Sequence, residues 1–302
     1  MRESELIEWI RSQSDFDPAA VPVGPGDDMA VLVCGRQRVL VTTDQVLDGV
    51  HFVLAEHGPR AVGWKAMARC LSDVAAMAAE CVAAVATVAL PRGFARADAE
   101  ELYRGMRAVG EPAGCPLVGG DVGSWPGPLS VSMTALARPG GIEPVLRSGA
   151  RVGDVVFVTD RLGGAWRTGR HLAFTPRIEA ARALATATDL HAMIDLSDGL
   201  STDLAHVCRA SGVGAEVIAE AVPIHPDAGR AEDPLAAALG DGEDYELLFT
   251  VSPEGAGRLL SCEPGGVPLT RIGRIVQGDQ LTLLRANGRR EPLRPTGWEH
   301  RT

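Results

Sequence analysis

The sequence predicts a mixed α/β (α+β) fold built from two domains that pack side by side. The chain has 302 residues, a length between one large domain and two ordinary ones. Hydrophobic residues make up 46% of it and charged residues 23%, which is the composition of a globular protein with a substantial core. Apolar runs alternate with helical patterns in two halves of similar size, and an Asp- and Gly-rich turn introduces each half.

The N-terminal half begins with a helical pattern and continues with strands. Leu6, Ile7 and Ile10 have helical spacing and predict a helix over 3–12. Apolar runs on both sides of a Gly-Arg-Gln-Arg turn predict a β-hairpin, and Pro59 is typical of the first turn of a helix. The remaining expectations are the hairpin strands 29–34 and 39–43, a helix from Pro59 to about 79, a strand 82–90, a helix 97–110, a short strand ending at Val118 and a strand 129–136.

The C-terminal half follows the sequence Ala-Arg-Pro-Gly-Gly at 137–141, which interrupts the pattern and indicates a linker. We therefore expect residues 1–140 and 141–302 to form the two domains. The polar turns DLSDG and GDGEDY each lead into a regular element. The predicted elements are a strand 154–159, a helix 176–186, a helix 200–211, a strand 246–251 and a helix starting at Pro253.

Charge and composition exclude several classes of protein. The net charge of −10 and the pI of about 5.2 argue against non-specific binding to nucleic acid or to an anionic membrane. No apolar run approaches the roughly 18 residues of a membrane span, and acidic residues near the start argue against a signal or transit peptide. The six cysteines show neither paired nor zinc-type spacing, so we expect reduced thiols. These features predict a cytoplasmic protein.

Common phosphate-binding motifs are absent from the sequence, and one basic residue is unusual. The sequence contains no Walker A motif, no Gly-x-Gly-x-x-Gly after a strand, no kinase signature and no EF-hand loop. Of the 29 basic residues, 28 are arginine and the single lysine is Lys65. Either Lys65 survives by chance, or its position requires the compact charge of an ammonium group.

Short acidic segments lie at the ends of predicted strands or in turns. Asp73 is an exception, because it lies among apolar residues of a predicted helix, where an unpaired charge is costly. Any one of these segments could be an ordinary turn, but carboxylates that converge repel one another unless cations lie between them. Oxygen ligands of this kind suit Mg²⁺ together with substrate phosphates. The segments contain Asp27, Asp28, Asp44, Asp73, Asp121, Asp195, Asp198, Glu243 and Asp244.

Seven motifs occur in an order that resembles the thiamine-monophosphate kinases. They are GDD, TTDQVLDGVHF, LSDVAAM, GGD, RSGARVGD, IDLSDGLSTDL and GEDYELLFT, and the resemblance runs from about Gly24 to Trp298. These kinases belong to the superfamily of aminoimidazole-ribonucleotide synthetase and selenophosphate synthetase. The resemblance implies an ATP-dependent, Mg²⁺-dependent enzyme that converts thiamine monophosphate to thiamine diphosphate by direct in-line transfer of the γ-phosphate.

The resemblance also implies a homodimer. Residues 1–140 would bind ATP and Mg²⁺ and form a β-barrel-like dimer core, and residues 141–302 would complete the active site. Asp44, Asp121 and Lys65 match positions with a catalytic role. The ATP contacts would be Tyr103, Gly120, Arg147 and Ser197, and the thiamine monophosphate contacts His51, Glu243 and Trp298. The ligands of several Mg²⁺ ions would be Asp28, Thr42, Thr43, Asp44, Asp73, Asp121, Asp195 and Asp198.

From the residues alone, other interpretations stay open. His51 and Tyr103 could serve packing, Arg147 could be a surface charge, and Trp298 could fasten the tail to the domain. Asp48 and Asp203 match no functional position and are interpreted as turn or capping residues. Val122 replaces the family's usual Thr after GGD, and the sequence AWRTGR after Gly164 leaves the loop too short for a clear role in covering the ligand.

Rival functions can also be weighed against the sequence. A selenophosphate synthetase needs a reactive Cys near its N-terminus, and a hydrogenase-maturation enzyme needs a C-terminal Cys. Here the first cysteine is Cys34, in a predicted strand, and the last two residues are Arg and Thr. A protein that only binds metal or nucleotide, without catalysis, is the alternative from a different class.

Overall fold

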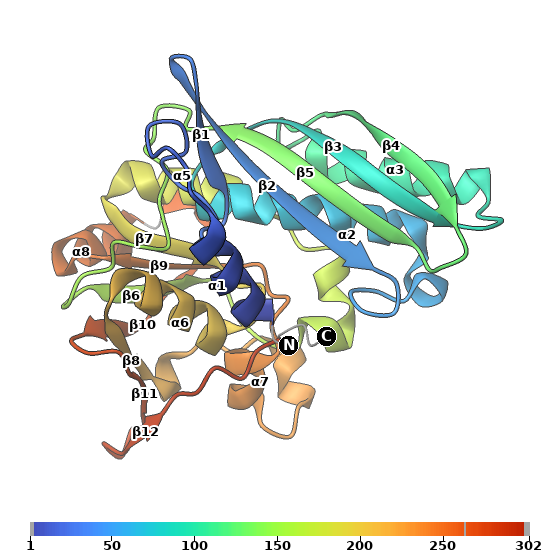
Figure 1. Cartoon of the computed structure of the whole chain (residues 1–302). Helices are drawn as coiled ribbons and strands as arrows, with labels where there is room; N and C mark the ends of the chain where they lie inside the picture. The colour runs from blue at the N-terminus through green and yellow to red at the C-terminus, as the bar shows by residue number, and fades with distance from the viewer. Residues whose placement is uncertain (1–2, 263, 299–302) are drawn as a thin grey trace.

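The computed structural model describes residues 3–262 and 264–298, and two β-sheets organise it (Figure 1). The first sheet has five strands in the spatial order β1-β2-β5-β3-β4. Neighbouring strands are antiparallel except β3 and β4, which are parallel. The strands are β1 (Ala30–Cys34), β2 (Gln37–Leu47), β3 (Glu80–Pro91), β4 (Leu117–Trp125) and β5 (Ser130–Arg138).

The second sheet has seven strands in the spatial order β12-β11-β8-β10-β6-β9-β7. Every residue of β6 and β9 is buried, because hydrophobic clusters cover both faces of the sheet at its centre. The strands are β6 (Val155–Thr159), β7 (Leu190–Asp195), β8 (Gly214–Ile218), β9 (Leu247–Val251), β10 (Leu269–Val276), β11 (Leu281–Leu284) and β12 (Arg290–Pro292).

Helices cover these sheets, and α2 lies between them. Its side chains contribute to the core of the first sheet, while Ala75, near its end, belongs to a cluster with residues of the second sheet. Figure 1 shows α2 and α3 on one face of the first sheet. The helices are α1 (Glu3–Gln13), α2 (Leu54–Ala76), α3 (Arg96–Gly110), α4 (Ala165–Thr168), α5 (Ile178–Ala187), α6 (Leu200–Ser211), α7 (Pro234–Gly240) and α8 (Pro253–Cys262).

Two glycines bring α2 and α3 unusually close together. A Cβ atom on Gly63 would lie 2.0 Å from the carbonyl oxygen of Leu102, and one on Gly105 would lie 2.0 Å from that of Arg60. Only glycine fits at these positions. The close packing buries one face of the first sheet, whereas the other face carries exposed apolar residues such as Val85 and Leu136.

Most predicted elements are present, and the differences have local causes. The hairpin of β1 and β2 and the helices 97–110 and 200–211 lie close to their predicted bounds. The predicted end of a strand at Val118 is wrong, because β4 continues to Trp125 as a parallel partner of β3. Gly119 and Gly120 indicate a turn in sequence, yet they are extended here and hydrogen-bonded into the sheet. Asp121 therefore belongs to a strand.

Other features agree with the composition. Helix α2 begins before Pro59, but Gly58 has φ 75° and breaks it, so the regular part starts at the predicted position. In the described part of the chain no helix is long and apolar enough to cross a membrane. The five cysteines whose side chains are described are free thiols, and the side chain of Cys262 lies outside the described residues. The second sheet contains strands that the sequence did not predict, β7, β8, β10, β11 and β12.

Candidate active site

Three aspartates from distant segments meet between the two sheets. Asp28 precedes β1, Asp73 lies on α2 and Asp195 ends β7, and one carboxylate oxygen of each lies within 4.8 Å of the others. Burial and the neighbouring carboxylates raise the pKa of Asp195 to about 7 and that of Asp73 well above its usual value. The fold therefore places these acidic groups where their negative charges are poorly compensated.

Hydrogen bonds satisfy only part of this cluster. The Arg147 guanidinium contacts Asp28 at 2.5 Å, and Ser72 donates to Asp195 at 2.6 Å. Asp28 Oδ2 is buried without a hydrogen-bond partner among the described residues. A hard cation with oxygen ligands fits this arrangement, because it would satisfy the orphaned oxygen and offset the carboxylate repulsion.

The predicted ligands of strand β2 divide between the two faces of the sheet. The Thr42 hydroxyl donates to Asp73 at 2.5 Å, and Asp44 forms an ion pair with Arg69 of α2 at 3.1 Å. The Thr43 hydroxyl instead donates to the Met133 carbonyl, and the residue is exposed. Because successive side chains of a strand point to opposite faces, the structure brings Thr42 and Asp44 toward the aspartate cluster and leaves the Thr43 side chain away from it.

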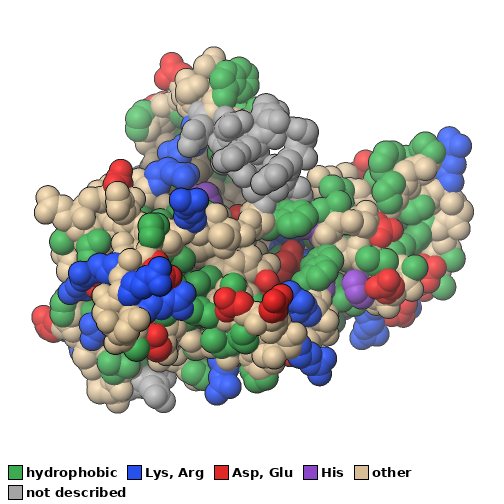
Figure 2. All heavy atoms as spheres, turned by 90° about the horizontal axis from the view of Figure 1, so that it is seen from below, with side chains coloured by type: hydrophobic (Ala, Val, Ile, Leu, Met, Phe, Trp, Pro, Cys, Tyr) green, Lys and Arg blue, Asp and Glu red, His purple; other side chains and the backbone are tan. Residues whose placement is uncertain are grey.

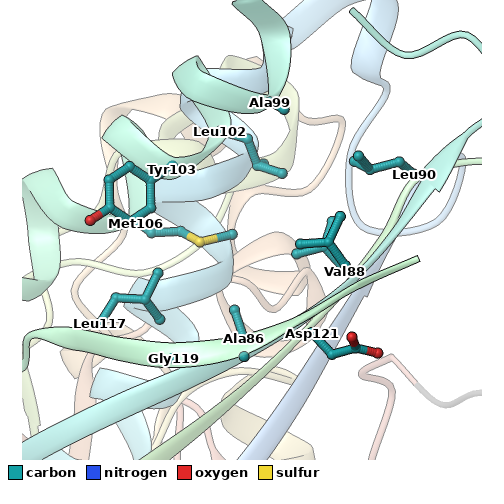
Figure 3. A pocket seen from close by; sticks show the side chains of 12 residues that line it. Ala86, Val88, Leu90, Ala99, Leu102, Tyr103, Met106, Leu117, Gly119 and Asp121 are labelled. Atoms are coloured by element: carbon teal, nitrogen blue, oxygen red, sulfur yellow. The ribbon is translucent and has the colours of Figure 1, made fainter. Parts of the chain in front are cut away.

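Asp121 also lies on the other face of this sheet. Its register partner on β3 is Thr87, which is exposed, whereas the neighbouring pair Ala86 and Gly120 faces α3. Figure 3 shows the Asp121 side chain pointing away from the cavity that its neighbours line. Asp121 is therefore separated from Asp28, Asp73 and Asp195 within one chain.

An apolar cavity of about 250 Å³ lies between α3 and strands β3 and β4 (Figure 3). Tyr103 lies on its wall, and Gly120 is part of its floor. A Cβ atom on Gly120 would lie 1.9 Å from the Ala86 carbonyl oxygen, so glycine is required there. The structure thus brings two predicted nucleotide contacts together, while Arg147 and Ser197 lie beside the aspartate cluster and at the turn after β7.

Lys65 and the predicted substrate contacts form a second group next to the aspartates. Lys65 is fully buried and donates to the Glu243 carboxylate and, at 2.7 Å, to the His51 carbonyl. Burial lowers the pKa of Lys65 to about 8, although Glu243 opposes the shift. The His51 Nδ1 accepts the Leu47 backbone N–H at 3.1 Å. These contacts make Lys65 a support for Glu243 in this structure.

Glu243 and Trp298 both contact the turn that follows β7. The Glu243 backbone N–H donates to the Ser197 carbonyl at 2.8 Å, and the Trp298 backbone N–H donates to the Asp198 carbonyl at 3.1 Å. The Trp298 side chain is 55% exposed. Asp198, Asp203 and His206 also lie close enough together to share a metal ion. Residues 195–198 therefore join the aspartate cluster to the predicted substrate contacts.

The two unassigned aspartates are capping residues. Asp203 accepts the backbone N–H groups of Asp198 and Gly199, just before α6. Asp48 accepts the Leu54 N–H at the start of α2. Both contacts satisfy donors that a helix start leaves without an intrahelical partner.

Sequence reasoning missed three residues that border this site. Trp166, on the short helix α4, stacks on His171 with ring centroids 4.5 Å apart, and the Lys65 Nζ lies 5.2 Å from the centroid of the Trp166 ring. Arg69 and Tyr245 lie close to Asp44 and Glu243. In the sequence, Arg69 is marked only by its spacing, because it lies four residues from both Lys65 and Asp73 on one predicted helix.

Two family models match this chain. The family model described as AIR synthase related protein, N-terminal domain, matches residues 26–138, and its C-terminal counterpart matches residues 151–285. A thiamine-monophosphate kinase of Rhodopirellula baltica is 40% identical to this chain over 99% of the chain and 97% of the relative. This chain belongs to the thiamine-monophosphate kinase family.

Further relatives of the family agree. The thiamine-monophosphate kinase of Mycobacterium tuberculosis is 36% identical, over 88% of this chain and 83% of that protein. A solved structure described as AaThiL complexed with AMPPCP and TMP superposes with a TM-score of 0.84 at 29% identity, covering 99% of this chain and 97% of that one. The predicted family and the predicted two-domain mixed α/β fold are confirmed.

Proposed function

We propose that this chain is an ATP-dependent kinase that phosphorylates thiamine monophosphate to thiamine diphosphate. Membership of the thiamine-monophosphate kinase family supports this activity, as does the fold shared with a relative described in complex with AMPPCP and TMP. The observation that carries the proposal is the turn at residues 195–198. It joins the cluster of Asp28, Asp73 and Asp195 to the group formed by Glu243 and Trp298.

The reaction would be the in-line attack of a phosphate oxygen of thiamine monophosphate on the γ-phosphorus of ATP. The new P–O bond forms as the bond from the γ-phosphorus to the bridging β-phosphate oxygen breaks, and ADP leaves. The attacking phosphate is ionised near neutral pH, so the site requires positioning and charge compensation rather than a general base. Asp28, Asp73 and Asp195 would hold Mg²⁺ together with Thr42, Asp44 and Asp198. Thr43 and Asp121, on the other face of the first sheet, would contribute to a separate Mg²⁺ ion. The bound ions would offset the negative charge of both phosphate groups.

The substrates would lie on either side of the aspartate cluster. The apolar cavity beside Tyr103 and Gly120 suits a nucleotide base, and Arg147 and Ser197 would contact its phosphates. Glu243, held by Lys65, and Trp298 would contact thiamine monophosphate together with His51. An indole face suits the permanent positive charge of the thiazolium ring.

A homodimer is part of the proposal. The open face of the five-stranded sheet carries exposed apolar residues, among them Val82, Val85 and Leu136, and a second copy would cover them. Asp121 points to the same face, so dimerisation would change its surroundings as well. Residues 1–140 would supply this interface and most Mg²⁺ and ATP contacts, and residues 141–302 would complete the site. As an ATP-consuming enzyme with free thiols, the protein would act in the cytoplasm.

One assay tests the activity. Purified protein is incubated with ATP, Mg²⁺ and thiamine monophosphate, and thiamine diphosphate is followed by chromatography. We expect product only in the complete mixture, and none when thiamine replaces its monophosphate. Nucleotide binding without any product, over a range of Mg²⁺ concentrations, would instead identify a protein that binds its ligands without catalysis. The molar mass measured by light scattering in solution tests the dimer, because it should be twice the mass of one chain.

A further inference from the structure

Helix α2 presents three functional side chains along one face. Lys65, Arg69 and Asp73 are spaced four residues apart, so they lie on successive turns of the same side. Lys65 contacts Glu243 at the proposed thiamine end, and Asp73 belongs to the aspartate cluster. Arg69 lies between them. If the proposed function holds, the phosphate of thiamine monophosphate would lie between these two ends, near Arg69.

The Arg69 guanidinium uses only part of its hydrogen-bonding capacity. One terminal nitrogen contacts Asp44 at 3.1 Å, and the other is 3.5 Å from the Gln45 carbonyl, at the limit of a hydrogen bond. The Nε atom is buried without a hydrogen-bond partner among residues 3–262 and 264–298. Because a guanidinium offers five N–H donors and no acceptor, its remaining capacity can be met only by acceptor atoms.

Tyr245 provides a second unsatisfied polar atom in the same region. Its ring is buried and stacks on Phe174 at a centroid distance of 3.9 Å, and its backbone has φ 52°, so its position is well defined. Its hydroxyl is buried and has no hydrogen-bond partner in the described structure. Burial raises the pKa of Tyr245 well above its usual value, and the nearby Arg69 guanidinium opposes the rise. The phenol therefore stays protonated and can donate.

The chemistry of these two atoms selects a class of ligand. Both are donors, so the partner that would satisfy them supplies acceptor atoms. A metal ion does not satisfy them, because it offers no acceptor atom to either donor. Asp44 contacts Arg69 at 3.1 Å, and Glu243 lies two residues before Tyr245, so two carboxylates border this position. An oxygen-rich anion satisfies the two donors, and the Mg²⁺ ions proposed at the aspartate cluster would offset its repulsion by Asp44 and Glu243.

We propose that Arg69 Nε and the Tyr245 hydroxyl bind the phosphate group of thiamine monophosphate. This inference rests on the proposed function and assigns the residues that recognise the phosphate of that substrate. The Phe174 ring keeps the phenol in place, and the ion pair with Asp44 keeps the guanidinium in place. The two donors would then orient the attacking phosphate between the carboxylate cluster and Glu243.

Calorimetric titration with thiamine monophosphate and with thiamine, both in Mg²⁺, tests this assignment. Tyr245→Phe removes one oxygen that has no described protein partner, so its folding should be unaffected. It should weaken binding of thiamine monophosphate about two- to tenfold, as expected for one neutral hydrogen bond. Arg69→Met should weaken it by about tenfold or more, as expected for a charge-assisted contact. Binding of thiamine, which has no phosphate, should be unchanged in both variants.

Two further variants distinguish a loss of phosphate binding from a general loss of structure. Arg60→Met removes an exposed arginine of the same helix, 3.5 Å from Glu101, and should bind both ligands normally. Arg69→Lys keeps the charge but not the Nε donor, so it should stay weaker than the unmodified protein. The proposal is overturned by unchanged affinity for thiamine monophosphate in Tyr245→Phe and Arg69→Met, by equal losses for both ligands, or by full recovery in Arg69→Lys. Failure of the unmodified protein to phosphorylate thiamine monophosphate would contradict the proposed function instead.

Discussion

Lys65 and Glu243 are 178 positions apart in sequence and form a buried ion pair. The Lys65 ammonium also donates to the His51 carbonyl, and the Trp166 ring lies beside it. The pair links α2 to the GEDY segment, where Glu243 has a left-handed backbone with φ 60°. One contact thus holds a strained loop of the C-terminal half against the principal helix of the N-terminal half. Figure 2 shows acidic side chains at the hollow between the two lobes of the molecule.

Lys65→Arg tests whether the single lysine is required. The longer, planar guanidinium does not fit a fully buried position between Glu243, the His51 carbonyl and Trp166, so Glu243 should lose its orientation. We expect kcat/KM for thiamine monophosphate to fall about tenfold or more, with a higher KM for this substrate. Steady-state kinetics provides the measurement. A fully active Arg variant would mean that any positive charge suffices and that the lysine persists by chance.

The pH dependence of substrate binding should report the same ammonium group. The pKa of Lys65 is lowered to about 8 by burial, so the charged form predominates below pH 8 and is lost above it. Without that charge Glu243 loses its partner, and KM for thiamine monophosphate should rise as the pH passes 8. Glu243, from the segment before β9, and Arg69, one turn along the same helix, are the charged groups that act on Lys65. A KM that stays constant from pH 7 to 9.5 would contradict this assignment.

Removal of Mg²⁺ should abolish activity and lower the stability of the protein. EDTA should stop product formation, and added Mg²⁺ should restore it. Because a ligand that binds only the folded state stabilises it, Mg²⁺ should also raise the Tm at pH 8 without substrates. Asp195→Asn should raise the Tm in EDTA, since it removes one of three crowded carboxylates, and should reduce the effect of Mg²⁺. Full turnover in EDTA would refute the metal site.

Asp121→Asn tests whether Asp121 is a functional residue or an ordinary strand residue. Asp121 is exposed on β4 and opposite Thr87, so the change should leave the Tm within about 1 °C of the original value. We nevertheless expect turnover to fall by orders of magnitude, because the residue is a predicted Mg²⁺ ligand. Thr87→Ala, on the same face, provides the control. Near-normal activity with an unchanged Tm would make Asp121 a purely structural residue.

Trp298→Ala tests the aromatic contact with the substrate. The indole is 55% exposed, and the backbone of the residue is held by the Asp198 carbonyl. A cation–π contact of roughly 0.5–2 kcal/mol predicts that KM for thiamine monophosphate rises about 2- to 30-fold while KM for ATP barely moves. Trp9→Ala, at an equally exposed tryptophan on α1, should change neither value. Equal losses for both substrates together with a lower Tm would show that Trp298 fastens the tail instead.

Much of the organisation could be predicted from the sequence, because it depends on local patterns. The periodic segments of α3 and α6 carry their own signals. The residues that form the aspartate cluster could also be selected, since the motifs around Asp28, Asp73 and Asp195 occur in the order found in one family. Site residues that are marked by their type and by the order of their motifs can therefore be identified from the sequence.

Only the tertiary structure decided which side chains meet. Gly119 and Gly120 favour a turn locally, but parallel pairing with β3 extends them and turns Asp121 to the open face of the sheet. The pleat of β2 separates Thr43 from Thr42 in the same way. Arg69 lies outside the seven motifs, and Tyr245 has no assigned role within its motif, so the two become a candidate phosphate site only because α2 packs against the GEDY segment. Side-chain direction and long-range contacts follow from strand register and packing, which depend on partners far away in the sequence.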